Sequence, residues 1–252
     1  MLQSLARRHS LVLCAVLLAA FFCSCSGRID GTIREDGDSA GAELRLAAAL
    51  EPRMAALLRS LSMMVLDKQA APDAPLLNGP AMARSLSGAP GISSAALENS
   101  GPTAVRGTVI IANLDEFLAV PGLSPDSLAG SSLLLKYDPA GTLRIRLDRE
   151  TGPRILPLLS EDVNAYLSAL LAPVATGEAV TRAEYLGLVA TIYGRGVADE
   201  ITAARIQVNL EAPRTITSIR GGTARGRQAQ FSISLPDLLV LEQPLDYEIS
   251  WK

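Results

Sequence analysis

The 252-residue chain has very few of the residue types that carry most enzyme chemistry. Its single histidine is His9, and its three cysteines are Cys14, Cys23 and Cys25. If a leader is removed before Cys25, the remaining chain keeps one cysteine and no histidine. Ser-His-Asp and Cys-His catalysis, an intramolecular disulfide, and histidine or thiolate sites for zinc, copper or iron are then excluded.

Lysine is also scarce, and the net charge is slightly negative. The lysines are Lys68, Lys136 and Lys252, and no Ser-x-x-Lys signature precedes Lys136 on its predicted strand, so serine–lysine catalysis is not expected. The formal net charge of −3 argues against nucleic acid as a partner, because phosphate binding needs a basic face. What remains is carboxylate chemistry or no chemistry, and we expect no cofactor and no metal.

The N-terminus has the three parts of a secretory signal. Arg7 and Arg8 form a positive region, residues 11–22 are an unbroken apolar run, and Ser24 is a small residue at the expected cleavage site. The run is shorter than the roughly 20 residues of a membrane-spanning helix. The sequence therefore predicts that residues 1–24 are a signal peptide.

Two cysteines compete as the site of lipid attachment. Cys25 follows Phe22-Cys23-Ser24, which resembles a loose lipobox with phenylalanine where leucine is usual, whereas Cys23 follows the bulky Phe22. We predict lipidation at Cys25, export, and attachment to the cell envelope on the periplasmic or outer side of a bacterial membrane. An ordinary secreted protein with a free thiol is the alternative. Two or more acyl chains hold a protein durably on a bilayer.

Residues 25–252 are predicted to form one α+β domain, with an antiparallel sheet of hairpins and a meander and with helices packed on one face. Apolar residues alternate with polar ones over 29–34 and 44–50, and these segments predict a first hairpin. A second hairpin is predicted over 131–137 and 142–148. The last fifty residues alternate over 206–210, 215–219, 229–235 and 245–251, which indicates an antiparallel meander. Trp251 shares the inward phase of the last strand.

Helices are predicted between these strands. Pro52 suits a first helical turn, Ser160 can begin a second helix, and Thr181-x-x-Glu184 is a capping box that begins a third. Residues 69–103 are rich in Ala, Pro, Gly and Ser. We interpret them as a long loop or flap with short helical turns near 82–86 and 94–97.

The C-terminal strand punctuation resembles a known family. The pattern runs from Val208-x-Leu210-x-x-Pro213 through Gly221-Gly222 and Phe231-x-Ile233-x-Leu235 to Trp251, and it is similar to the C-terminal strands of LppM-like bacterial lipoprotein domains. A lipidated cysteine followed by a hairpin fits the same family. The resemblance covers about a third of the chain and implies no catalytic residues.

Three kinds of local feature could mark a site. Arg220, Arg225 and Arg227 share a glycine-rich segment that could bind an anion through arginine side chains and free backbone amides, although an exposed hairpin tip is the favoured interpretation. Adjacent acid pairs occur at 115–116, 161–162 and 199–200, where first-turn positions in helices explain them better than catalysis does. The cluster 35–39 faintly suggests a calcium loop but lacks the full spacing.

The sequence therefore predicts a membrane-anchored envelope lipoprotein that is not an enzyme and that binds or scaffolds another envelope component. The first alternative is a carrier of an apolar ligand or lipid. The second is a carboxylate-based hydrolase. An enclosed cavity would favour the carrier, and converging buried acids would favour the hydrolase.

Overall fold

The computed structural model describes residues 26–36, 39–65, 75–118, 135–138, 141–153, 156 and 161–252. The predicted signal peptide and the predicted lipidation site Cys25 lie outside these residues. Much of the predicted flap is included, and so are the arginines of the proposed anion-binding segment.

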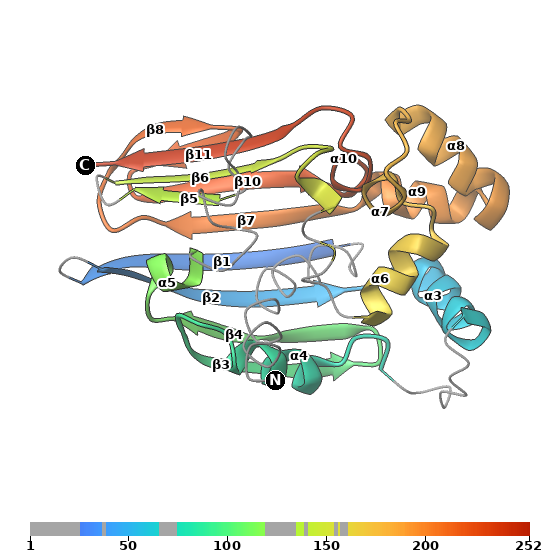
Figure 1. The fold of residues 1–252 in the computed structure, drawn as a ribbon, viewed down its shortest axis with the longest axis horizontal. Helices are drawn as coiled ribbons and strands as arrows, with labels where there is room; N and C mark the ends of the chain where they lie inside the picture. The colour runs from blue at the N-terminus through green and yellow to red at the C-terminus, as the bar shows by residue number, and fades with distance from the viewer. Residues whose placement is uncertain are drawn as a thin grey trace, which may run out of the picture.

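The larger of two sheets has seven strands in the order β3-β4-β2-β1-β7-β10-β9 (Figure 1). Their bounds are β1 Ser26–Asp36, β2 Ser39–Ala49, β3 Ile92–Gly101, β4 Ala104–Ile111, β7 Arg205–Glu211, β9 Gly222–Arg225 and β10 Gln228–Ser234. The predicted first hairpin is confirmed, because β1 and β2 pair antiparallel along their full length from Ser26↔Ala49 to Asp36↔Ser39. The alternation of apolar residues is confirmed too, since every second residue of β7 and β10 is buried.

The smaller sheet has four strands in the order β5-β6-β11-β8. Their bounds are β5 Leu135–Asp138, β6 Thr142–Leu147, β8 Ile216–Arg220 and β11 Leu245–Trp251. The second predicted hairpin is confirmed as β5 and β6, and Trp251 is buried as its phase predicts, with 1% of its surface exposed.

The prediction of a C-terminal meander is wrong in its pairing. β7 lies beside β1 in parallel, from Ser26↔Arg205 to Thr32↔Glu211, and β10 pairs with β7, whereas β8 and β11 belong to the other sheet. Alternation fixes which face of a strand is buried but carries no information about its neighbour. The four strands of the predicted meander are therefore divided between two sheets.

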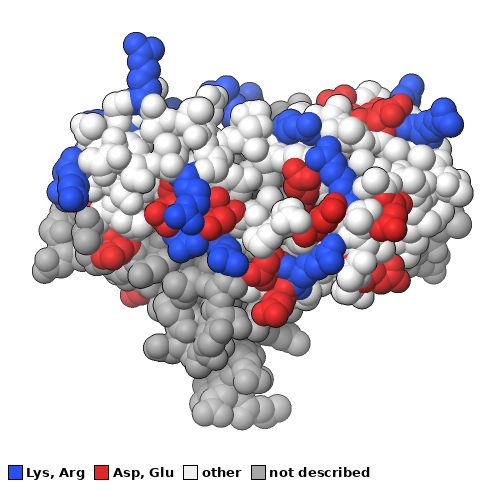
Figure 2. Space-filling model, turned by 90° about the horizontal axis from the view of Figure 1, so that it is seen from above, with Lys and Arg blue, Asp and Glu red and all other residues white. Residues whose placement is uncertain are grey.

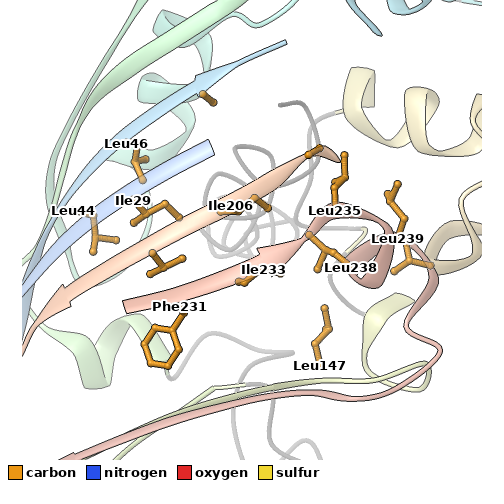
Figure 3. Close-up of a cluster of buried hydrophobic side chains, with 14 of the residues drawn as sticks. Ile29, Leu44, Leu46, Leu147, Ile206, Phe231, Ile233, Leu235, Leu238 and Leu239 are labelled. Carbon is orange, nitrogen blue, oxygen red and sulfur yellow. The ribbon is translucent and has the colours of Figure 1, made fainter. Parts of the chain in front are cut away.

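The apolar faces of the two sheets meet and form much of the core. Figure 3 shows Phe231 of β10 pointing toward the smaller sheet and Leu147 of β6 pointing back. The rings of Phe231 and Tyr247 pack edge to face, with centroids 5.4 Å apart, which is a favourable aromatic geometry. The smaller sheet therefore covers β10, where sequence alone predicted that helices would.

The helices complete an α+β architecture, which confirms the predicted fold class. Their bounds are α3 Pro52–Val65, α4 Gly79–Ser87, α5 Leu114–Leu118, α6 Glu161–Ala169, α7 Pro173–Thr176, α8 Arg182–Tyr193, α9 Arg195–Ala203 and α10 Leu235–Val240. The predicted capping box is confirmed, because the Thr181 side chain accepts from the Glu184 amide while the Glu184 side chain accepts from the Thr181 amide. Helices α3, α6, α8 and α9 gather at one end of the strands, which we call the helical end (Figure 1). The opposite end, where β1 turns into β2, is the hairpin end.

The prediction of a loop or flap over 69–103 is wrong for its described part. Helix α4 confirms the helical turn near 82–86, but residues 94–97 belong to β3, which pairs with β4 through two register shifts. This strand is rich in Ser and Ala and has little β propensity of its own, so its partner strand decides its structure. Gly107 of β4 permits the close approach, because a Cβ there would lie 2.0 Å from the Ala96 carbonyl oxygen.

Candidate functional site

An open groove of about 770 Å³ lies on the outer face of the seven-stranded sheet at the helical end. The first residues of β1, the last of β2, the first of β4 and the C-terminal part of α9 surround it. Its floor consists of small side chains, namely Ala47, Ala48, Ala49, Ala104, Ala203 and Ala204. Ser26, the residue after the predicted lipidated cysteine, is part of its wall.

Arginines at the rim of this groove already have partners. The Arg28 Nε donates to the Asp30 carboxylate at 2.7 Å, and this hydrogen bond lowers the pKa of Asp30 more than any other contact. Arg106 Nε donates to Glu98 at 2.8 Å. Arg205 donates to two backbone carbonyls at 2.7 Å, those of Thr202 and Ala204. The rim therefore carries mixed, mostly satisfied charge and does not form a cationic site.

Glu200 has a clear structural role beside the same groove. Its carboxylate accepts hydrogen bonds from the backbone amides of Met54 at 2.8 Å and Arg53 at 3.2 Å. These amides belong to the first turn of α3, where no backbone carbonyl is available to them, and where the helix dipole favours a negative charge. Glu200 of α9 thus caps the N-terminus of α3 and links the two helices.

The other two acid pairs lie in the first turns of their own helices, as expected, whereas Asp199 and Glu200 lie in the second turn of α9. Glu161 is the first residue of α6, and the Glu116 amide in α5 donates to the Asn113 side chain at 3.1 Å. The side chains of Asp115, Glu161 and Asp162 lie outside the described set. Within the part of the chain that is described, no three acids or other ligand residues group into a metal site.

The predicted anion-binding arginines do not share one loop. Arg220 ends β8, Arg225 ends β9, and Arg227 follows in the turn to β10, with positive φ at Gly221 and Gly226 making the two tight turns. Arg220 donates to Asp246 at 3.1 Å, and Arg227 pairs with Glu211 at 2.9 Å. An anion at this segment would therefore compete with two carboxylates that already neutralise two of the three arginines.

Asp246 links this segment to the neighbouring strand. It accepts two hydrogen bonds from Arg144 of β6, at 2.8 Å and 3.0 Å, as well as the one from Arg220. Donation from Arg144 is the main cause of the lowered pKa of Asp246. This network links β6, β11 and β8 across the outer face of the smaller sheet.

A second open groove of about 650 Å³ lies between α4 and the strands β2, β3 and β4. Pro80 and Ala83 of α4 form one wall, and Glu98, Arg106 and Arg45 bring charge to the opening. Figure 2 shows the same mixture at larger scale, because basic and acidic side chains are interspersed over the visible face without a wide field of one sign.

Strand β11 contacts the hairpin end through the side chain of Trp251. The Trp251 indole Nε1 donates to Glu35 at 2.9 Å, and Arg214 donates to the other oxygen of the same carboxylate at 2.5 Å. The indole hydrogen bond, followed by that of Arg214, lowers the pKa of Glu35. Sequence analysis noted Glu35 only as part of the incomplete calcium-loop cluster, because only the fold brings a residue 216 positions away into contact with it.

Exposed apolar side chains at the helical end were not anticipated from the sequence. Leu188 is 40% exposed, Ile192 is 49% exposed and Leu171 is 39% exposed. Leu171 lies two residues beyond the end of α6 and has a positive φ. Leu188 and Ile192 sit on α8 next to the buried residues Tyr185 and Val189, so that α8 is apolar around most of its circumference, a recognisable signal in the sequence.

Comparisons with known proteins give one likeness. No family model matches the chain, and no curated protein matches it. A search of solved structures finds the folded domain of LppM from Mycobacterium tuberculosis, with a TM-score of 0.37 and 11% identity over 90% of this chain and 89% of that one. It bears the same family name as the sequence resemblance, and at this score it assigns neither a family nor a function. None of the described helices is long and apolar enough to cross a bilayer.

Proposed function

We propose that this protein is an envelope lipoprotein, anchored through acyl chains on Cys25, whose folded part binds or scaffolds another envelope component without catalysis. The observation that carries the proposal is the position of β1. This strand begins at Ser26, directly after the expected lipidated residue, and it lies inside the large sheet between β2 and β7. Cleavage before Cys25 would thus leave every described strand intact and would need no linker.

The arrangement of the acids supports a non-catalytic role. Hydrolases that use two carboxylates hold them about 5–10 Å apart across a cleft. Here Glu200 caps α3, Asp246 fastens three strands and Glu35 holds Trp251, so these carboxylates serve the fold. The two grooves described above are open and have charged rims, whereas an apolar ligand prefers an enclosed apolar site.

Metabolic labelling tests the anchor. Cells that express the full chain are grown with an alkyne palmitate analogue, and the protein is captured and examined for label and for membrane association. We expect label in the wild type and in Cys23→Ala, and none in Cys25→Ala, which should stay unprocessed or leave the membrane. Label that survives Cys25→Ala and disappears in Cys23→Ala would move the anchor to the other cysteine. Absence of label in all three proteins would refute the proposal that the protein is a lipoprotein.

Purification of the labelled wild type tests the binding role. The intact protein is cross-linked in cells, purified in detergent and analysed for bound proteins and for non-covalent lipid. We expect a specific envelope protein in stoichiometric amount, absent from a parallel capture of the Cys25→Ala protein. Stoichiometric non-covalent lipid without any protein partner would favour the apolar-ligand carrier instead.

A further inference from the structure

We propose that the helical end of the protein rests on the bilayer, with Leu188 and Ile192 of α8, together with Leu171, placed in the interface between headgroups and acyl chains. The inference rests on the proposed lipid anchor at Cys25. It adds the orientation of the folded part and the surface that touches lipid.

The tether fixes which end can approach the membrane. One residue spans at most about 3.6 Å, so a lipid on Cys25 must leave the protein close to Ser26. Ser26 is held on both sides, by pairing with Ala49 of β2 and with Arg205 of β7. The acyl chains therefore emerge where β1 begins, which is the helical end.

The hairpin end is held away from this point by the length of β1. The strand has 11 residues, and at about 3.3 Å per residue the distance from Ser26 to the turn is on the order of 30 Å. A planar bilayer that takes up the acyl chains beside Ser26 meets the helical end first. Trp251, hydrogen-bonded to Glu35 near the far end of β1, stays remote from it.

The same end carries large apolar side chains that the described residues leave 39–49% exposed. Leu188 and Ile192 are one helical turn apart on α8, and the neighbouring Gly187 and Thr191 are exposed as well. Helix α8 leads through Gly194 into α9, which ends next to Arg205, the partner of Ser26. The apolar surface and the tether thus belong to one continuous part of the fold (Figure 1).

Leu171 directly follows two residues that α8 contacts. The Tyr185 hydroxyl donates to the Leu170 carbonyl at 3.4 Å, and the Tyr193 hydroxyl donates to the Ala169 carbonyl. These bonds hold α8 against the C-terminal end of α6, directly beside Leu171. Helix α8 has 12 residues and a length of about 18 Å at 1.5 Å per residue, which suits a short helix lying in the plane of a membrane interface.

Single-cysteine labelling tests this orientation. Cleavage removes Cys14 and Cys23, and the Cys25 sulfur is acylated, so an introduced cysteine is the one free thiol of the processed protein. Ile192→Cys and Leu188→Cys are labelled with bimane in the purified full-length processed protein. Each is reconstituted into vesicles of phosphatidylcholine and phosphatidylglycerol, with and without brominated phosphatidylcholine as a quencher.

Ile110→Cys is the matched control. Ile110 is also an exposed isoleucine, at 40%, on the outer face of the seven-stranded sheet. It pairs with Glu43, while Ala104 pairs with Ala49 at the helical end, so six residues of β4, or about 20 Å, separate it from the level of Ser26. Its label is expected to remain in water.

We expect brominated lipid to remove roughly half of the emission at positions 188 and 192, because an interfacial helix lies about 5–10 Å deep, and to leave the Ile110→Cys label nearly unchanged. Flotation of each protein with the vesicles reports the anchor independently. Protein that floats with equal quenching at 110 and 192, or with no quenching at 188 and 192, would overturn the orientation while the anchor stands. Protein that fails to float would refute the anchor itself and, with it, the orientation.

Discussion

The two ends of the β-strands differ in how far their large side chains are buried. At the hairpin end, an indole that is 1% exposed donates to Glu35, which also accepts from Arg214, so the indole and the carboxylate have partners within the protein. At the helical end, the backbone is equally well satisfied, since Glu200 caps α3 and Thr181 caps α8. Yet large apolar side chains on and beside α8 remain in solvent.

We infer from this difference that side chains at the hairpin end stabilise the fold, whereas the exposed side chains on α8 serve an interaction. Isolated exposed apolar residues are normal on any protein, but a group of them at the end that carries the proposed lipid anchor indicates a surface that is covered in use. If this view is right, substitutions at the hairpin end lower the free energy of unfolding, and substitutions of the exposed residues on α8 do not. Four predictions test that contrast, beginning with the largest effect.

Trp251→Ala should be the most damaging change at the hairpin end. It empties a fully buried site and leaves Glu35 without its indole donor, and we expect a loss of about 3–5 kcal/mol in the free energy of unfolding. Urea unfolding followed by far-UV circular dichroism measures it, because the substitution removes the fluorescent residue. Lys252→Ala, at the exposed next position, is the control. A loss below about 1 kcal/mol would mean that the last strand contributes little to the core.

Glu200→Ala should cost about 1–2 kcal/mol, because two amides in the first turn of α3 lose their acceptor. The effect tests whether the helical end is stable by its own contacts. Asp199→Ala changes the neighbouring exposed acid and should leave the unfolding midpoint close to that of the wild type. Equal losses in the two variants would attribute the effect to general charge, not to capping.

Glu35→Gln should lower stability by about 1 kcal/mol at neutral pH, since the charged acceptor of two donors is lost. The folded-state pKa of Glu35 lies below its ordinary value of 4.5, so its contribution is present above that value and is lost as the pH falls through the lowered pKa. The difference between wild type and variant should therefore shrink below about pH 4.5. Urea midpoints at several pH values measure it, with Glu178→Gln as the control; a constant difference would exclude the ionised carboxylate as the cause.

Ile192→Ser should change the free energy of unfolding by no more than about 0.5 kcal/mol, because the side chain is 49% exposed and makes few contacts to lose. Val189→Ser, on the buried side of the same helix, should be far more destabilising. Thermal melts of both variants in detergent make the comparison. Similar losses in the two would show that Ile192 packs within the protein, and the contrast between the two ends would then disappear.

Local sequence patterns predicted the elements whose cause is local. The Thr181–Glu184 capping box fixes the start of α8, and the strict alternation of Phe231 and Ile233 with polar neighbours fixes the inward face of β10. A helical pattern shows which residues could be buried but not where the packing ends, and Leu171, just beyond α6, is 39% exposed. The local sequence also gave no indication of the ion pairs of Arg220 and Arg227, since their carboxylate partners lie on other strands.

The sequence by itself determined the α+β class, the first hairpin, the buried phase of Trp251 and the shortage of catalytic and metal-binding side chains. Only the tertiary structure decided that β7 lies parallel to β1, that β3 is a strand, and that β1 begins at the same end of the molecule as α8. The physical reason is the distance along the chain over which each interaction acts. Capping and alternation act over a few residues, whereas strand partners and trans contacts such as Glu200 with α3 depend on segments far apart in the chain.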